Sequence, residues 1–210
     1  MTSYKDLGSH PLGKVALKLH AKNKYTATRL SPLILMTDPT RIPDLPNIVA
    51  TLPKGSAIIY RHFGKKDHVI EAQLLREITK AQNQQLLIGG GDIDLALKIK
   101  ADGVHFSRNT KLVDLREFKA LHPNKLVTLA ALKTGSYDGS LTFLDGLFVS
   151  SIFKSNSPSA GEPIGLKHLK QAVIKFKAPI IALGGITAQT APKLIGSGIY
   201  GLASIDGFKT

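Results

Sequence analysis

A short apolar run near the end of the chain stops abruptly on two glycines, and this pattern has the clearest chemical meaning in the sequence. Residues 179–183 are followed by Gly184, Gly185, Ile186 and Thr187. A continuous apolar run bounded by proline and glycine predicts a parallel strand buried on both faces, followed by a turn that opens a helix. Backbone N–H groups at a helix N-terminus, with no side chains in the way, suit a phosphate. The run therefore predicts a site for a small phosphorylated molecule.

Arg61 and His62 follow another apolar run, and they are the candidate catalytic residues. A guanidinium at a strand terminus can hold a phosphate through two parallel hydrogen bonds, which favours an anion contact for Arg61. A histidine beside an arginine is more often a packing or hydrogen-bonding residue than a catalytic base. Both roles stay open for His62.

Eight short apolar runs predict the strands that would position these residues: 33–38, 57–62, 85–88, 103–106, 126–131, 146–151, 179–183 and 199–205. Between them, apolar residues at helical spacing predict helices over 67–83, 111–121, 166–176 and 188–195. The interval 133–144 is rich in Gly, Ser and Thr and gives the weakest helical pattern.

Strict alternation of strand and helix indicates parallel pairing through right-handed crossovers. Eight such units predict an α/β protein with a single compact (β/α)₈ TIM barrel. A doubly wound open sheet is the alternative, because periodicity alone does not distinguish a closed sheet from an open one.

In either architecture the chemistry belongs at the carboxyl ends of the strands. The loops after strands seven and eight of such a barrel commonly form a phosphate site. This assigns Gly184, Gly185, Ile186 and the backbone of Asp206 and Gly207 to phosphate binding.

Three carboxylates, those of Asp38, Asp92 and Asp206, also follow strands. Two of them could hold Mg²⁺. Asp92 stands where a helix N-cap is expected, however, and the cap is the favoured role. His105 lies within a predicted strand, which favours a hydrogen-bonded structural histidine.

The first thirty residues are predicted to form a basic extension, 1–30, ahead of the barrel, 31–210. They carry six cationic side chains against Asp6 alone: Lys5, Lys14, Lys18, Lys22, Lys24 and Arg29. A solvated, partly helical extension is the expected structure. The chain as a whole has a net charge of +13, which favours anionic partners.

The amino-acid composition limits the cellular compartment and the kinds of partner that we expect for this protein. The 210 residues include no cysteine, which fits a reducing compartment. No apolar run approaches the roughly 20 residues that span a bilayer, and the N-terminus has no signal-peptide pattern, so a cytoplasmic protein without a membrane partner is expected. With five Tyr, eight Phe and no Trp, the chain is poor in the stacking side chains that nucleic-acid binding needs. A phosphorylated small molecule is the expected partner, and the oligomeric state stays open, a homo-oligomer included.

Several short motifs resemble those of the thiamine phosphate synthase and thiazole tautomerase superfamily. The segments that carry the resemblance are Leu-Met-Thr-Asp at 35–38, Asp-Leu-Ala at 94–96, Ala-Asp-Gly-Val-His at 101–105 and Gly-Gly-Ile at 184–186. The resemblance extends over about 33–208. It implies a small (β/α)₈ barrel, a role in thiamine biosynthesis and a thiazole-type phosphate as ligand.

The resemblance also implies a reaction whose metal ligands this chain lacks. Family synthases join a pyrimidine pyrophosphate to a thiazole phosphate, and Mg²⁺ with cationic side chains stabilises the departing pyrophosphate. The family's Asn-Asp pair after the third strand aligns with Gly90 and Gly91, and its second aspartate aligns near Thr110. No metal-binding residue is therefore assigned, although Mg²⁺ is the cofactor expected of the family.

The phosphate-contacting residues are only partly kept. Of the family's Gln-x-Arg-x-Lys, only Arg61 remains. In the loop after the sixth strand, Ser155 and Ser157 keep the hydroxyls of the family's Thr-x-Thr-Lys, Pro158 replaces the lysine, and Lys154 is the candidate substitute. The histidine that the tautomerases use aligns with Leu132.

The sequence therefore predicts a divergent family member that binds a thiazole-type phosphate and has a degenerate metal and pyrophosphate site. A transferase like the family synthases is one function implied by the resemblance. The alternatives are a divergent isomerase acting on a related heterocyclic phosphate through Arg61 and His62, and a non-catalytic barrel that binds a phosphate ester.

Overall fold

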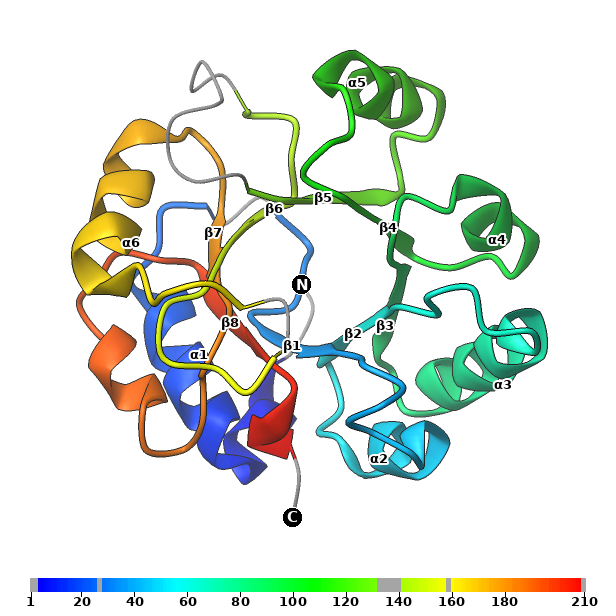
Figure 1. Cartoon of the computed structure of the whole chain (residues 1–210), viewed down its shortest axis with the longest axis horizontal. Coiled ribbons are helices and arrows are strands. Elements are labelled where there is room, and N and C mark those ends of the chain that lie inside the picture. The colour runs from blue at the N-terminus through cyan, green and yellow to red at the C-terminus, as the bar shows by residue number, and fades with distance from the viewer. Residues whose placement is uncertain (1–3, 26–27, 132–140, 158–159, 209–210) are drawn as a thin grey trace.

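The fold is a closed barrel of eight parallel strands (Figure 1), in a computed structural model that describes residues 4–25, 28–131, 141–157 and 160–208. Each strand pairs with its neighbours in chain order, and the register Leu33↔Leu202 joins the first strand to the last. The strands are β1 (Leu33–Met36), β2 (Ala57–Tyr60), β3 (Gln85–Ile88), β4 (Gly103–Phe106), β5 (Leu126–Ala130), β6 (Gly146–Val149), β7 (Ile180–Ala182) and β8 (Gly201–Ser204). The eight predicted strands are confirmed, and the open-sheet alternative is wrong.

Helices follow most strands and cover the outside of the barrel (Figure 1). They are α2 (Leu45–Thr51), α3 (His68–Ala81), α4 (Ile93–Lys98), α5 (Leu112–Leu121) and α6 (Gly165–Lys175). None of the helices in the described part of the chain has both the length and the hydrophobicity of a membrane-spanning segment. The interval 133–144 falls largely on residues 132–140, which lie outside the described part of the chain.

The helix predicted over 188–195 is much shorter than expected. Only the 3₁₀ helix η2 (Ala191–Leu194) forms there, and a second 3₁₀ helix, η3 (Asp206–Phe208), follows β8. Pro192 lies in the first turn of η2, and Gly196 has a φ of +83°, which ends the helical segment. The loop after β7 therefore does not open a regular α-helix.

The N-terminal segment is helical and basic, but it is not a solvated extension. It forms the 3₁₀ helix η1 (Lys5–Ser9) and the helix α1 (Pro11–Ala21), which packs beside β8 and η2 (Figure 1). The apolar face of α1 is buried, with Leu12 and Leu19 at 0% and 4% exposure. Amphipathic spacing explains the difference, because apolar residues three and four apart face the barrel while the lysines face solvent.

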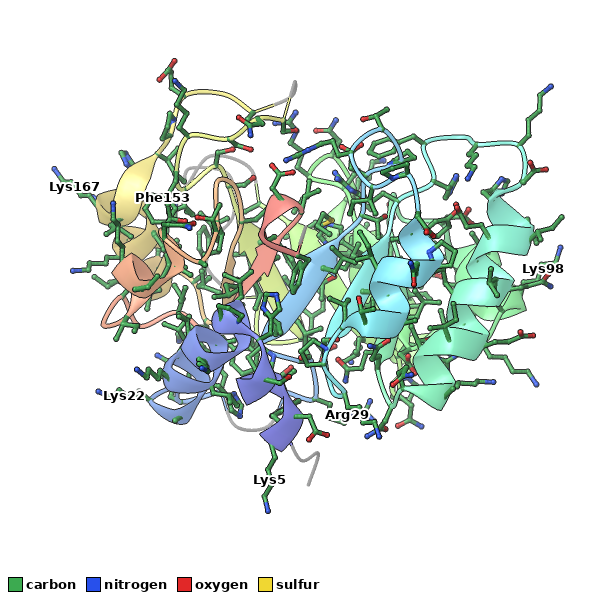
Figure 2. All side chains as sticks on the ribbon, turned by 90° about the horizontal axis from the view of Figure 1, so that it is seen from below. Lys5, Lys22, Arg29, Lys98, Phe153 and Lys167 are labelled. Carbon is green, nitrogen blue, oxygen red and sulfur yellow. The ribbon has the colours of Figure 1, made fainter. Side chains whose placement is uncertain are left out.

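The basic side chains of this segment lie away from the loops that follow the strands. Figure 2 shows Lys5, Lys22 and Arg29 along the lower side of the molecule, distant from Phe153 of the loop after β6. Their charge therefore contributes little to the surface around those loops.

The barrel interior is filled by buried side chains, so a ligand of this barrel would lie at an end of the strands and not between them. Tyr200 is fully buried, and its hydroxyl donates a hydrogen bond of 2.6 Å to the carbonyl of Leu30. Side chains on the inward face of the strands pack as one cluster with two residues that precede β1 and β8, Leu30 and Tyr200. The strand residues of the cluster are Ile34, Met36, Ala57, Ile59, Leu87, Leu126, Phe148, Ile181 and Ala203. The barrel is thus a rigid base for the loops at its carboxyl end.

Candidate functional site

A cavity of about 800 Å³ lies at the carboxyl ends of the strands. Its lining includes nine of the ten residues that the sequence assigns to the site. They are Arg61, His62, Lys154, Ser155, Ser157, Gly184, Gly185, Ile186 and Asp206. Barrel closure therefore brings together side chains and loops that are up to 145 residues apart, as Arg61 and Asp206 are.

Gly184 and Gly185 occupy positions that only glycine can take without distortion. Their φ angles are +97° and +65°, in the region that side chains disfavour. A Cβ on Gly184 would lie 2.8 Å from Cα of Ser151, and one on Gly185 would lie 2.3 Å from the carbonyl oxygen of Lys154. The loop after β7 is thus pressed against the loop after β6.

A threonine hydroxyl fixes the turn that follows the two glycines. Oγ1 of Thr190 donates to the carbonyl of Gly185 at 2.8 Å and accepts the N–H of Thr187 at 2.9 Å. The N–H groups of Gly185 and Ile186 donate no hydrogen bond to any described residue. Successive free N–H groups in a glycine turn form a concavity that suits an anion. Because η2 is so short, the loop's own N–H groups, and not a helix dipole, would attract it.

Asp206 and Gly207 lie against this loop but differ from expectation. The N–H of Gly207 donates to Oγ of Ser204 at 2.9 Å, and that hydroxyl donates to the carbonyl of Ile186 at 2.6 Å. The Gly207 N–H is therefore already used, so it is not a free donor for a phosphate. Asp206 forms an ion pair with Arg41, a cavity-lining residue that the sequence analysis did not single out.

Arg61 is held firmly at the cavity wall. Its Nε donates to the carbonyl of Thr37 at 2.7 Å, and its backbone N–H donates to Oγ1 of the same threonine at 2.8 Å. Nη2 lies 3.8 Å from Oδ2 of Asp38, and the guanidinium lies 5.1 Å from the ring centre of Phe63. Burial lowers the pKa of Arg61; Asp38 opposes this effect and the charge of Arg41 adds to it. Arg61 is thus a fixed cation facing the cavity.

The ring nitrogens of His62 both have partners. Nδ1 accepts the N–H of Gly64 at 3.1 Å, and Nε2 lies 3.3 Å from Oδ2 of Asp92. Nε2 must then carry a proton to donate to the carboxylate, which leaves no lone pair free for a general base. The ring also stacks on His68, with 4.5 Å between centres. This geometry favours a hydrogen-bonding role over a catalytic one.

Asp92 caps a helix, as its position in the sequence predicts. Its Oδ1 accepts the N–H of Leu95 at 2.9 Å, at the start of α4. Its second oxygen, Oδ2, is the partner of His62, so the same carboxylate both caps α4 and holds the His62 ring.

The carboxylates in and beside the cavity do not fit a magnesium ion of the kind that the resemblance implies. Asp38 accepts hydrogen bonds from Thr40 and lies near Arg61, Asp206 pairs with Arg41, and Asp92 serves as a cap. Among the described residues, no group of three or more His, Asp or Glu side chains converges on one point. The available carboxylates are committed to cations and backbone N–H groups, so we assign no step to a metal.

The loop after β6 contributes hydroxyls and one exposed lysine to the cavity rim. Oγ of Ser155 accepts the N–H of Ser157 at 3.3 Å. Lys154 is exposed, and its backbone carbonyl is the atom that presses on Gly185. Pro158 lies outside the described residues.

His105 is a structural histidine at the bottom of the cavity, as predicted. Nδ1 lies 2.9 Å from Oγ1 of Thr128, and the ring meets Phe148 edge-on at 4.8 Å. Burial, with a smaller contribution from Arg61, lowers the pKa of His105 from 6.5 to about 3. The imidazole is therefore neutral at physiological pH and too weak a base to take a proton from a ligand.

The buried His105 should make the fold sensitive to mild acid. Above pH 6.5 the ring is neutral in both states, whereas between about pH 6.5 and 3 only the unfolded chain binds the proton. The free energy of unfolding should therefore fall by up to about 1.4 kcal/mol per pH unit as the pH drops through this range. Urea unfolding at several pH values measures this dependence.

The variant His105→Gln serves as the comparison. It lacks the titrating ring, so its stability should depend less on pH between 6.5 and 4.5 even where it is less stable at pH 7. His10 and His20, whose pKa values burial also lowers, titrate in both proteins. Equal slopes for the two proteins would contradict the assignment.

Comparisons with known proteins extend over the whole barrel. The sequence profile of a family described as thiamine monophosphate synthase matches residues 33–208, from the first residue of β1 to the last of η3. A putative thiamine-phosphate synthase 2 of Aquifex aeolicus is 35% identical over 139 residues, which are 65% of this chain and 73% of that protein. A thiamine-phosphate synthase of Clostridium novyi is 28% identical over 158 residues, 72% of this chain and 76% of that protein.

A solved structure shows the same fold. The thiamine phosphate pyrophosphorylase of Pyrococcus furiosus superimposes with a TM-score of 0.64 and 21% identity, over 85% of this chain and 87% of that one. The same fold occurs in a glycerol uptake operon antiterminator regulatory protein of Listeria monocytogenes. That structure superimposes with a TM-score of 0.55 and 16% identity, over 82% of this chain and 90% of that one. The fold by itself thus does not decide the function.

Proposed function

This chain belongs to the thiamine monophosphate synthase family, and from that membership we propose that it binds a thiazole-type phosphate ester in the cavity and takes part in thiamine biosynthesis. The phosphate lies on the N–H groups of Gly185 and Ile186. The observation that carries this proposal is the glycine turn with its two N–H groups that have no partner among the described residues.

The charges around the cavity support an anionic ligand. Four cationic side chains line it, those of Arg41, Arg61, Arg108 and Lys154. Asp92 and Asp206 are the carboxylates in the same lining, and each already faces a partner. Low-dielectric walls strengthen the attraction between such cations and a phosphate.

Synthase chemistry is not part of the proposal. Expelling pyrophosphate requires stabilisation of the charge that develops on the leaving oxygen, and the cavity offers no carboxylate set for Mg²⁺ within the described residues. The loss of several kcal/mol of such stabilisation slows a reaction by orders of magnitude. We therefore expect little or no thiamine phosphate formation.

A non-catalytic barrel that binds a phosphate ester is the second candidate function. The engaged ring nitrogens of His62 favour it over an isomerase, because an isomerase needs a free base close to the ligand. The low pKa of His105, which burial holds near 3, removes the other imidazole of the cavity as a base.

Calorimetry with three compounds tests the proposal. Thiazole phosphate should bind, and its dephosphorylated alcohol should bind at least about a hundredfold more weakly, because the charged hydrogen bonds to the loop are lost. Pyrimidine pyrophosphate with Mg²⁺ should give no thiamine phosphate when mixed with thiazole phosphate and the protein. Equal affinity for the ester and the alcohol would refute the phosphate loop, and efficient thiamine phosphate formation would refute the degenerate site.

A further inference from the structure

A carboxylate stands beside the loop to which the phosphate is assigned. Asp206 lines the same cavity as Gly185 and Ile186. The next residue, Gly207, packs directly on the loop, since a Cβ there would lie 2.9 Å from the carbonyl oxygen of Ile186. Unopposed, the negative charge of Asp206 would repel a phosphate at this position.

The positive charge of Arg41 opposes that negative charge across the junction between β1 and β8, where the barrel closes. It belongs to the loop after β1, and its Nη2 pairs with Oδ2 of Asp206 after β8. The side chains of Arg41 and Asp206 are only 12% and 27% exposed, so the pair is weakly screened by solvent.

The backbone of the β1 loop holds Arg41 in place. The N–H groups of Arg41 and Ile42 both donate to the carbonyl of Asp38, at 3.1 and 2.9 Å. The side chain of Asp38 accepts the N–H and the hydroxyl of Thr40 at 3.1 and 2.7 Å. The guanidinium therefore extends from a fixed turn.

Arg41 also keeps hydrogen-bonding capacity that no described residue uses. Its Nη1 is buried and lacks a hydrogen-bond partner among the described residues, as does Nη2 of Arg61. A buried guanidinium nitrogen without an acceptor is unfavourable, and an anion close to it relieves the deficit.

We infer that Arg41 is a specificity-determining residue of the phosphate site: it cancels the charge of Asp206, which would otherwise repel an anionic ligand, and its Nη1 is a donor that such a ligand can use. This inference rests on the proposed function, because it requires the phosphate to lie on the Gly185–Ile186 loop. Arg41 and Asp206 together are neutral, and an added phosphate meets a guanidinium and not an isolated carboxylate.

The same contact could serve only to hold the loops after β1 and β8 together. The two explanations predict opposite effects of removing Asp206 on the affinity for phosphate. If the pair only clasps the loops, removing either partner loosens the site and weakens phosphate binding. If Arg41 acts through its charge, removing Asp206 removes the carboxylate paired with it, so the guanidinium attracts a phosphate more strongly and phosphate binding is strengthened. The sign of the Asp206→Asn effect therefore separates them.

A double-mutant cycle with inorganic phosphate as the probe, measured by calorimetry at pH 8, tests the inference. Arg41→Gln should weaken phosphate binding about tenfold or more, and Asp206→Asn should strengthen it several-fold. The double variant should return to within about threefold of the natural protein. Arg41→Lys, which keeps the charge, should lose less than Arg41→Gln.

The binding results distinguish a failure of the proposed function from a failure of the role assigned to Arg41. If the natural protein binds neither phosphate nor thiazole phosphate, the proposed function fails. If it binds them but Asp206→Asn weakens binding, or the double variant is as weak as Arg41→Gln, only the role of Arg41 fails. Thermal unfolding of each variant reports its folding, and the effect of Asp206→Asn decides the question even if Arg41→Gln does not fold.

Discussion

Replacing Gly185 by alanine should reduce phosphate binding at least about a hundredfold, the loss expected when two charge-assisted hydrogen bonds are broken. The new Cβ would lie 2.3 Å from the carbonyl oxygen of Lys154, a backbone atom that cannot rotate away. The loop after β7 must therefore move off the loop after β6, and the N–H groups of Gly185 and Ile186 move with it. Calorimetry with thiazole phosphate measures the loss.

Gly196→Ala is the matched control for this variant. Gly196 has a φ of +83°, similar strain for a side chain, but it is exposed and a Cβ there meets nothing within 4 Å. Both variants should lose about 1–3 kcal/mol of stability to backbone strain, and only Gly185→Ala should lose the ligand. Undiminished binding by a folded Gly185→Ala protein would place the phosphate elsewhere.

Deleting residues 1–30 should prevent the chain from folding into a stable barrel. The deletion removes the buried side chains of Leu7, Leu12, Val15 and Leu19 and exposes the surface of β8 and η2 that they cover. Each such side chain contributes ~1.5–3 kcal/mol, so the sum approaches the ~5–15 kcal/mol of a whole domain. Circular dichroism and urea unfolding of the truncated protein measure the effect.

The double variant Lys14→Glu and Lys18→Glu tests whether residues 1–30 stabilise the barrel through their buried side chains or through their positive charge. Both lysines lie on the exposed side of α1, so the change reverses charge without touching the buried face. Its stability should stay within about 1 kcal/mol of the natural protein. If the truncated protein unfolds at the same urea concentration as the full-length protein, the barrel 31–210 is stable without residues 1–30 and the prediction is wrong.

The strands were predictable because burial on both faces leaves a strong local pattern. Short, mostly apolar runs such as 85–88 and 103–106 coincide with β3 and β4. The glycine turn was predictable for a similar reason, since few residues other than glycine accept a positive φ. The burial of α1 had a signal as well, in the spacing of Leu12, Val15 and Leu19, but the many lysines obscured it.

The pairing of side chains in the cavity was not predictable from local pattern. Arg41 and Asp206 are 165 residues apart, and His62 and Asp92 are 30 apart. Their contacts exist because the barrel closes and places loops from different strands side by side. The sequence therefore supplied the residues at the carboxyl ends of the strands, while the partner of each became clear only from the three-dimensional arrangement.

The helix α1 and the loop after β7 both contact the backbone at Gly207. A Cβ on Gly207 would lie 2.6 Å from Cδ1 of Leu12 and 2.9 Å from the carbonyl oxygen of Ile186. Because α1 and the loop both contact Gly207, we expect docking of α1 and binding of a ligand at the loop to stabilise each other. Under the proposed function, a bound phosphate ester also holds the N-terminal helix down. The resistance of this chain to proteases should then rise with the concentration of its ligand.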